Sequence, residues 1–307
     1  MLGRTAGGLF WMFRYLERSE NTARLLEAGF RIALTRSSSA DQEWTSILAT
    51  IDAREAYDSA YEGYAAANVI NFLLRDKKHQ ASVLSMAEAA RNNAREVRTA
   101  LTREVFEATN ESYLTLKDML ARPVSERDLP GMLNTIRQQS ALVRGALHGT
   151  MLRNDIYNFA RLGTFLERAD NTARILDVKY YVLLPSIAHV GAAIDNVQWE
   201  TILRALSARQ AYRWLNKDEI SSVGIAKFLM LDARLPRSLA FCCNMLTSNL
   251  EQLAKDYGVT GPAQELGRQH RDRLTRRAMA SIMEDGLHET LETFIVANNA
   301  LAAQIEQ

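Results

Sequence analysis

Apolar residues recur at intervals of three and four along almost the whole chain, which is the spacing of one face of a helix. The first such stripe, which includes Leu9 and Leu16, predicts a helix over residues 7–36. No segment alternates with the period of two that indicates a strand, so we expect an all-α fold. Between prolines and polar loops, the same spacing predicts helices over residues 41–57, 63–75, 79–105, 107–121, 127–150, 153–184, 195–213, 218–231, 236–257, 262–277 and 279–306.

One helical motif occurs twice, 150 residues apart. Residues 13–26 read FRYLERSENTARLL, and residues 163–176 read GTFLERADNTARIL. Further blocks correspond in the same order at separations of 155 and 156 residues: Trp44 with Trp199, Tyr57 with Tyr212, Phe72 with Phe228 and Ser82 with Ser238. This pattern indicates a duplication. We therefore predict a single large helical domain made of two diverged, pseudo-twofold-related halves, residues 1–150 and 151–307.

Composition and charge limit the classes of partner. The chain has 307 residues, 47% of them hydrophobic, and a net charge of +1, which gives no broad attraction to nucleic acid or to an anionic membrane. The longest apolar stretch, around residues 180–194, is interrupted by Pro185 and His189 and falls short of the ~20-residue span of a membrane helix. The only cysteines are the neighbours Cys242 and Cys243, whose side chains diverge in a helix. We expect a reduced, cytoplasmic protein that binds neither nucleic acid nor membrane.

The repeated helix carries a polar face that invites a functional interpretation. Glu17, Asn21 and Arg24 lie at positions i, i+4 and i+7, which places them on one face, and Arg14 extends it toward the amino end. The second copy repeats this face with Glu167, Asn171 and Arg174, and the two copies also share Arg18 and Arg168. Polar residues on so much of the circumference indicate that the helix faces something specific.

Three interpretations of this face stay open. In the structural one, Glu20 with Arg24 and Asp170 with Arg174 form i,i+4 pairs, and the Glu-Arg dipeptides form cross-helix salt bridges that fix how the halves dock. In the second, both motifs surround one polar cavity, where arginines bind a carboxylate or phosphate and glutamates bind an amine or transfer a proton. In the third, the face binds a partner protein.

The motifs together resemble the bacterial Alpha-E family, whose members are predicted α-helical proteins named for a Glu-Arg motif. The residues that carry the resemblance are Tyr15–Arg24, Gly149–Arg153, Phe165–Arg174, Leu176–Tyr180 and Pro236–Leu239. The resemblance covers nearly the whole chain. One departure is His79-Gln80 before Ser82, where the second copy has Leu235-Pro236.

The resemblance implies a function by association. Members of the family are typically encoded beside, or fused to, a circularly permuted ATP-grasp ligase, often near a transglutaminase-like protein, in systems predicted to make or modify small peptides. We therefore expect an accessory or co-catalytic subunit of such a ligase system. This chain has no Walker-type loop and no dinucleotide fingerprint, so we expect it to bind no cofactor, with ATP and Mg²⁺ bound by the ligase.

Two alternatives remain beside this expectation, and the sequence does not decide whether the chain is an enzyme. A stand-alone acyl- or aminoacyl-transferring enzyme would use Glu17, Arg18, Glu167 and Arg168 as catalytic candidates. The candidates for substrate binding are Arg14, Asn21, Arg24, Asn171 and Arg174. The other alternative is a non-catalytic helical scaffold. The sequence leaves open a homo-oligomer and which copy of the motif is active.

Other clusters carry weaker signals. Residues 284–292 hold Glu284, His288, Glu289 and Glu292, which we interpret as a solvated acidic face rather than a metal site. The apolar surroundings of Cys242 and Cys243 predict helix core and no activated nucleophile. The arginine-rich segment Arg268–Arg277 is either a solvated helix face or a docking site for a partner. The paired tryptophans and tyrosines of the repeat are expected in the core.

Overall fold

The computed structural model describes residues 1–33, 40–183, 193–216 and 221–307. Within these ranges the regular structure is helical and contains no strand, which confirms the all-α prediction. The helices are α1 (Gly3–Ala33), α2 (Ala40–Thr50), α3 (Arg54–Asp58), α4 (Ala66–Arg75), α5 (Val83–Glu96), α6 (Arg103–Met119), α7 (Leu129–Thr150), α8 (Asp155–Leu183), α9 (Ala193–Ala205), α10 (Arg209–Asn216), α11 (Ser222–Leu231), α12 (Leu239–Tyr257), α13 (Pro262–Thr275), α14 (Met279–Asp285) and α15 (Leu287–Ile305), with a short 3₁₀ helix at Arg98–Ala100.

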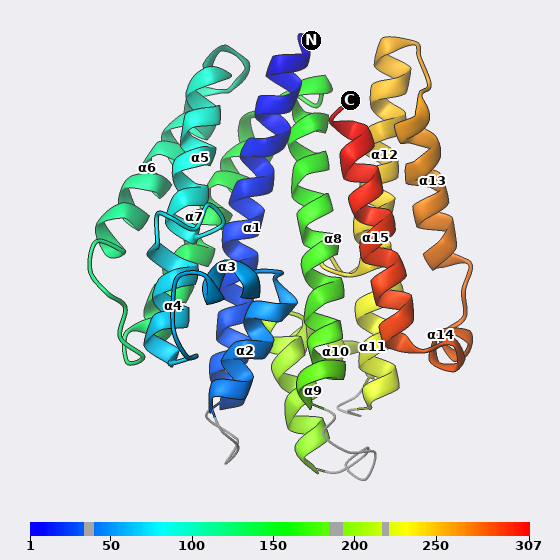
Figure 1. The fold of residues 1–307 in the computed structure, drawn as a ribbon. Helices are drawn as coiled ribbons and strands as arrows, with labels where there is room; N and C mark the ends of the chain where they lie inside the picture. The colour runs from blue at the N-terminus through cyan, green and yellow to red at the C-terminus, as the bar shows by residue number, and fades with distance from the viewer. Residues whose placement is uncertain (34–39, 184–192, 217–220) are drawn as a thin grey trace.

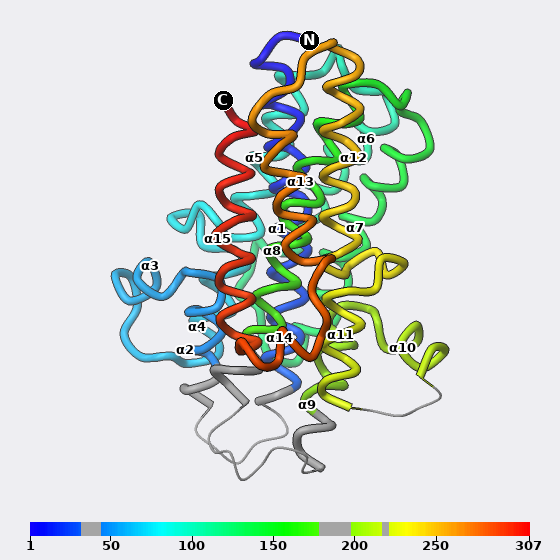
Figure 2. The backbone as a smooth tube through the Cα atoms, turned by 90° about the vertical axis from the view of Figure 1, so that its right-hand side faces the viewer, coloured from blue at the N-terminus to red at the C-terminus, as the bar shows by residue number. Residues whose placement is uncertain are grey.

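The two long motif helices, α1 and α8, form the centre of the molecule. They run side by side in the same direction, and their contact is the most extensive between any two helices (Figure 1). Helices α5, α6 and α7 pack on one side of this pair and α12, α13 and α15 on the other (Figures 1 and 2). The helices approach closely at Gly163, where a Cβ atom would lie 2.2 Å from the carbonyl oxygen of Phe10. Glycine at this position therefore allows the two backbones to touch.

The repeated aromatic residues lie in the core, as the sequence predicts. Trp44 and Trp199 are 2% and 4% exposed, and Tyr57 and Tyr212 are 0% and 2% exposed. Each tyrosine packs edge-on against the phenylalanine of its own half, Phe72 or Phe228. These pairs join α3 to α4 and α10 to α11.

Two of the predicted helices are wrong in the same way, because each is two helices. Residues 41–57 divide into α2 and α3 at Asp52, and residues 195–213 divide into α9 and α10 at Ser207. Both residues adopt a left-handed conformation, with φ of 56° and 55°. The amide groups of Ala53 and Ala208 return to the carbonyl oxygens five residues earlier, at 2.9 and 2.7 Å, as in a Schellman motif. Neither turn contains a glycine or proline, so the sequence does not indicate the break.

Other helix boundaries also differ from the prediction. The predicted helix 79–105 begins only at Val83, because Ser82 caps the amino end of α5, and it ends at Glu96. The predicted helix 279–306 is interrupted at Gly286, whose φ of 94° ends α14 and begins α15. Ser238 caps α12 as Ser82 caps α5, with its side chain accepting a bond from the amide three residues on.

The order α1 to α5 is followed again by α8 to α12, as the duplicated blocks predict. The pseudo-twofold relation and the boundary near residue 150 stay predictions. No described helix combines the length and the apolar character that crossing a membrane requires. The apolar stretch near residues 180–194 falls largely outside the described residues.

Candidate functional site

The two Glu-Arg dipeptides bind each other across the α1–α8 contact. Arg168 donates from Nε and Nη2 to the two carboxylate oxygens of Glu17, at 2.9 and 3.0 Å. Arg18 donates from Nε and Nη2 to the two oxygens of Glu167, at 2.9 and 2.6 Å. Each copy thus contributes the acid to one pair and the base to the other. The predicted cross-helix salt bridges are confirmed, with bidentate geometry.

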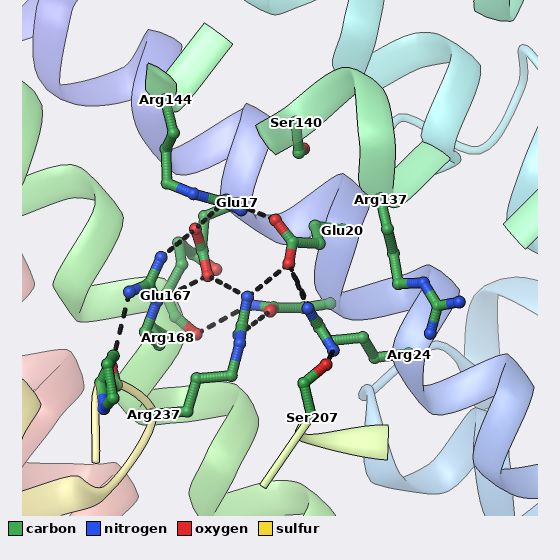
Figure 3. A network of polar contacts seen from close by, with 12 residues as sticks. Glu17, Glu20, Arg24, Arg137, Ser140, Arg144, Glu167, Arg168, Ser207 and Arg237 are labelled. Atoms are coloured by element: carbon green, nitrogen blue, oxygen red, sulfur yellow. Dashed lines mark hydrogen bonds and ion pairs between the residues drawn. The ribbon is translucent and has the colours of Figure 1, made fainter. Parts of the chain in front are cut away.

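On one side of the helix pair, two carboxylates are enclosed by arginines, and we call this group the closed site. Its members are Glu17, Glu20, Arg24, Arg144, Arg168 and Arg237 (Figure 3). Arg237 lies 2.5 Å from Glu20 and 3.1 Å from Glu17, and Arg144 binds both carboxylates as well. The carboxylate side chains are 1% and 0% exposed. The predicted i,i+4 pair of Glu20 with Arg24 therefore exists, and it is buried.

The charges of the closed site are fixed by their neighbours. Burial alone would raise the pKa of Glu17, but Arg168, Arg237 and Arg144 overcome it and hold that pKa well below its ordinary value. The pKa of Glu20 is lowered for the same reason, chiefly by Arg237. Burial lowers the pKa of Arg237 to about 10, against the opposing effect of the two carboxylates. A carboxylate held ionised by several arginines is poorly suited to proton transfer near neutral pH.

On the other side of the pair lies an open cavity of about 320 Å³, which we call the α1–α8 pocket. Its lining includes most of the predicted substrate-binding residues, but not Glu17, Arg24 or Arg168. The lining residues are Arg14, Arg18, Asn21, Thr22, Ile51, Asp52, Ala53, His79, Ala81, Leu166, Glu167, Asp170, Asn171, Arg174, Asn298, Asn299 and Ala302. The structure therefore divides the sequence-predicted site into a closed half and an open half.

Glu167 lies in the wall of the pocket with its oxygens already bonded. Arg14 donates to it from Nε at 2.8 Å, in addition to the two bonds from Arg18. Burial opposes ionisation, but Arg18 and Arg14 outweigh it and lower the pKa of Glu167. Arg14 also donates to Glu306 at 2.7 Å. Glu167 is thus a fixed anion that holds two arginines in the lining of the pocket.

Three residues that line the pocket each have one buried polar atom with no hydrogen-bond partner among the described residues: Asp170 Oδ1, Asn171 Nδ2 and Asn298 Oδ1. The other oxygen of Asp170 accepts a bond from Arg174 at 2.7 Å. Asn171 and Asn298 are only 7% and 2% exposed. An unpaired buried polar group costs about 1–3 kcal/mol, so a polar ligand that paired with these lining residues would remove part of that cost.

Asp170 is the pocket residue whose ionisation is least supported. Burial raises its pKa above the ordinary value, and Arg174 offsets this only in part. A cation bound to this carboxylate would supply the compensation that the protein itself does not provide.

One wall of the pocket comes from the turns of the first half. Asp52 stands at the left-handed turn after α2, and Arg174 fastens this turn by donating to the carbonyl oxygen of Thr50 at 2.9 Å. His79 stacks on the ring of Phe72, with centroids 4.1 Å apart. Burial lowers the pKa of His79, which keeps the imidazole neutral at physiological pH. The residue that departs from the family pattern therefore lines the pocket.

Several residues of both sites were missed by the sequence interpretation. Arg237 stands in a recognised block, directly before the matched Ser238, and this was the one available signal. Arg144 on α7 and Asn298 on α15 lie outside every recognised repeat block. Nothing in their local sequence distinguishes them from surface residues.

The remaining clusters do not join either site. Cys242 and Cys243 are buried free thiols, and burial raises the pKa of Cys242 to about 12, as expected for helix core. In the described part of the chain no three metal-ligating side chains are grouped to hold an ion, and His288 pairs with Asp177 at 2.6 Å. The arginines of 268–277 form ion pairs within the chain at Arg268, Arg271, Arg276 and Arg277, and their docking role stays a prediction.

Comparison with known proteins places the whole chain in one group. The model of the Alpha-E family, described as a predicted alpha-helical domain with a conserved ER motif, matches residues 1–307. Uncharacterized proteins of Mycobacterium bovis and of Mycobacterium tuberculosis are each 22% identical over 318 residues, which cover 97% of this chain and 35% of those proteins. The chain thus spans about a third of the length of these curated relatives. No solved structure matches it.

Proposed function

Because the chain belongs to the Alpha-E family over its full length, we propose that it is an accessory or co-catalytic subunit of a circularly permuted ATP-grasp peptide ligase system. In this proposal the α1–α8 pocket holds the amino acid or peptide on which the system acts. The ligase binds ATP and Mg²⁺ and activates a carboxylate, and a transglutaminase-like protein is a second candidate partner. The products are small synthesised or modified peptides.

The observation that carries the proposal is the pocket with its unpartnered atoms Asp170 Oδ1, Asn171 Nδ2 and Asn298 Oδ1. Its volume of about 320 Å³ lies at the lower end of the range for small-molecule sites, roughly 300–1,000 Å³. The residues that carry these atoms line the pocket, and they offer acceptors and a donor suited to the carbonyl, carboxylate and amino groups of a peptide. A molecule of one or two residues fits these dimensions.

The proposal assigns binding to this chain and bond formation to the ligase. Glu17 and Glu167 are each saturated by arginines and held ionised, so neither supports the alternative of a stand-alone transferase using them as acid or base. The reciprocal pairing of Arg168 with Glu17 and of Arg18 with Glu167 supports a further part of the proposal, the pseudo-twofold relation of the two halves.

The test is co-expression of the chain with the neighbouring ATP-grasp ligase, followed by co-purification and measurement of peptide product. We expect a complex, and product formation that falls when the chain is omitted. The variant Ala302→Phe fills the pocket from α15, and its matched control Ala303→Phe adds the same ring to an exposed neighbour. We expect the first to lower product formation and the second to leave it unchanged. A ligase that is fully active and unassociated without this chain would refute the proposal.

A further inference from the structure

Corresponding positions of the two halves contribute to the closed site and to the α1–α8 pocket. The first such position lies in the turn before α5 and in the similar turn before α12. Ser82 caps α5 and Ser238 caps α12, and in both turns the serine amide donates to the carbonyl oxygen three residues earlier, at 3.0 and 2.9 Å. The residue directly before the capping serine is Ala81 in the first half and Arg237 in the second. Arg237 reaches into the closed site, whereas Ala81 lines the pocket.

A second correspondence comes from the helices that flank the central pair. On α7, Ser140 donates to the carbonyl oxygen of Leu16 at 2.9 Å, and on α15, Asn298 donates to that of Leu166 at 3.1 Å. These carbonyls directly precede the two motif glutamates. Four residues further along each helix stand Arg144, which binds both carboxylates of the closed site, and Ala302, which lines the pocket. The pocket therefore has alanines at the two places from which arginines enter the closed site.

The hydrogen bonds of the corresponding carboxylates differ accordingly, because the pocket has alanines where the closed site has arginines. Glu20 accepts from Arg24, Arg144 and Arg237. Asp170, its counterpart in the second copy of the motif, accepts only from Arg174, and its Oδ1 is unpaired among the described residues. The pocket thus lacks the two guanidinium groups that Arg144 and Arg237 bring to the closed site, and it has Arg14 in addition, bound to Glu167 and Glu306.

The two sites also differ in charge, since the pocket has fewer arginines and more carboxylates than the closed site. The closed site combines four arginines with two glutamates. Three arginines and three carboxylates line the pocket, and Glu306, bound to Arg14, adds a fourth carboxylate. A ligand that brings positive charge into the pocket would restore part of the balance that the closed site has from its own side chains.

We propose that the α1–α8 pocket binds a guanidinium group carried by an amino acid or a short peptide, with Asp170 as its anionic anchor and Asn298 Oδ1 as a second acceptor. The ligand's group takes the place that Arg237 holds in the closed site. Asn171 Nδ2 is left to donate to a carbonyl or carboxylate of the same molecule. This inference rests on the proposed function in that it names the class of substrate delivered to the ligase.

The first test is calorimetric titration of the purified full chain with L-arginine, with agmatine, which lacks the carboxylate, with an arginine-containing dipeptide, and with L-citrulline, which has nearly the same shape but no charge. We expect the three guanidinium compounds to bind and citrulline to bind at least about tenfold more weakly, as the loss of a charge-assisted hydrogen bond requires. The comparison of arginine, agmatine and dipeptide shows which source of the group the pocket prefers. Equal binding of citrulline and arginine, or binding of neither, overturns the proposal.

Variants locate the binding. Ala81→Arg places into the pocket the side chain that the closed site already has, so we expect it to abolish arginine binding without lowering the melting temperature. Asp170→Asn should weaken binding at least about tenfold. Its control is Asp272→Asn, since Asp272 also pairs with an arginine four residues on, outside the pocket. Full affinity in Ala81→Arg, in a folded protein, contradicts the assignment.

The two proposals fail separately. If the ligase forms its complex and depends on this chain, but no guanidinium compound binds, the substrate class is wrong and the proposed function stands. If arginine binds and Asp170→Asn removes the binding, but the ligase neither associates with nor depends on the chain, the pocket assignment stands and the proposed function is wrong.

Discussion

Replacing each motif glutamate by glutamine separates the structural role of the closed site from that of the pocket. Glu17→Gln removes a carboxylate that is 1% exposed and is bound by Arg168 at 2.9 Å, Arg237 at 3.1 Å and Arg144 at 3.2 Å. After the change, four arginines share the single carboxylate of Glu20. Glu167→Gln is the matched substitution on the other side of the same helix pair.

The structure gives different magnitudes for the two changes. Breaking a buried ion pair by removing one partner costs about 3–5 kcal/mol, which for a chain of this size corresponds to roughly 5–8 °C in melting temperature. Glu167→Gln leaves Arg18, which is 36% exposed and can turn to water, and Arg14, which keeps its bond to Glu306. We therefore expect a smaller loss of about 1–3 kcal/mol, or roughly 2–5 °C.

The assay is thermal unfolding of both variants and the unsubstituted chain, followed by circular dichroism at pH 7 and at pH 3.5. The pKa of Glu17 in the folded protein lies below its ordinary value, so its contribution is fully present above the pKa of an unfolded glutamate, about 4.3, and is lost as the pH falls. The gap between Glu17→Gln and the unsubstituted chain should therefore narrow at pH 3.5.

The result that would refute this reasoning is a Glu17→Gln variant that melts with, or above, Glu167→Gln at pH 7. A gap that widens on acidification would also contradict it, since that sign requires a raised pKa. If Glu17→Gln instead keeps its stability and abolishes turnover by the ligase system, the closed site has a chemical role that its geometry does not suggest.

Three further predictions concern single positions. Relative to the unsubstituted chain, Asp170→Asn should change the melting temperature more favourably at pH 7.5 than at pH 4.5. The reason is that a carboxyl group whose folded pKa is raised destabilises the folded chain as the pH rises through that pKa. A variant that loses more melting temperature at pH 7.5 than at pH 4.5 contradicts this. Gly163→Ala should destabilise by about 1–3 kcal/mol in urea unfolding, because its Cβ meets a backbone carbonyl at 2.2 Å, whereas Gly145→Ala, with nothing within 4 Å, should not destabilise. Cys242 and Cys243 should resist a disulfide reagent until the chain is unfolded, because burial raises their pKa values; rapid native labelling would show exposed thiols.

The central pair of helices, α1 and α8, was predictable because the same motif occurs twice in the sequence. The spacing of the apolar positions fixes α1 and α8, and the identical Glu-Arg dipeptides indicate contact between the copies. The breaks at Asp52 and Ser207 were not predictable, since neither residue is a glycine or proline, and tertiary contacts select the left-handed conformation. Arg24 and Arg174 make such contacts, each donating to a carbonyl beside one of these turns.

The division into a closed and an open side could not be read from the motif, because it is decided by residues outside it. Glu20 and Asp170 differ little in sequence, and their surroundings differ through Arg144 and Arg237 on one side and two alanines on the other. The alignment that matches Ser82 with Ser238 does place Ala81 opposite Arg237. The effect of this difference on the site depends on the direction of the Arg237 side chain, and packing determines that direction.

The reciprocal pairs Glu17–Arg168 and Arg18–Glu167 have a consequence for symmetry. They are the contacts that an isologous homodimer of a single unit would make, each subunit giving an acid to one bond and a base to the other. In such a dimer both sites would be identical, either both filled by an arginine or both open. A chain that contains both units can hold Arg237 at one site and Ala81 at the other, which a homodimer of identical units cannot, so one site is closed by its own side chains while the other stays open.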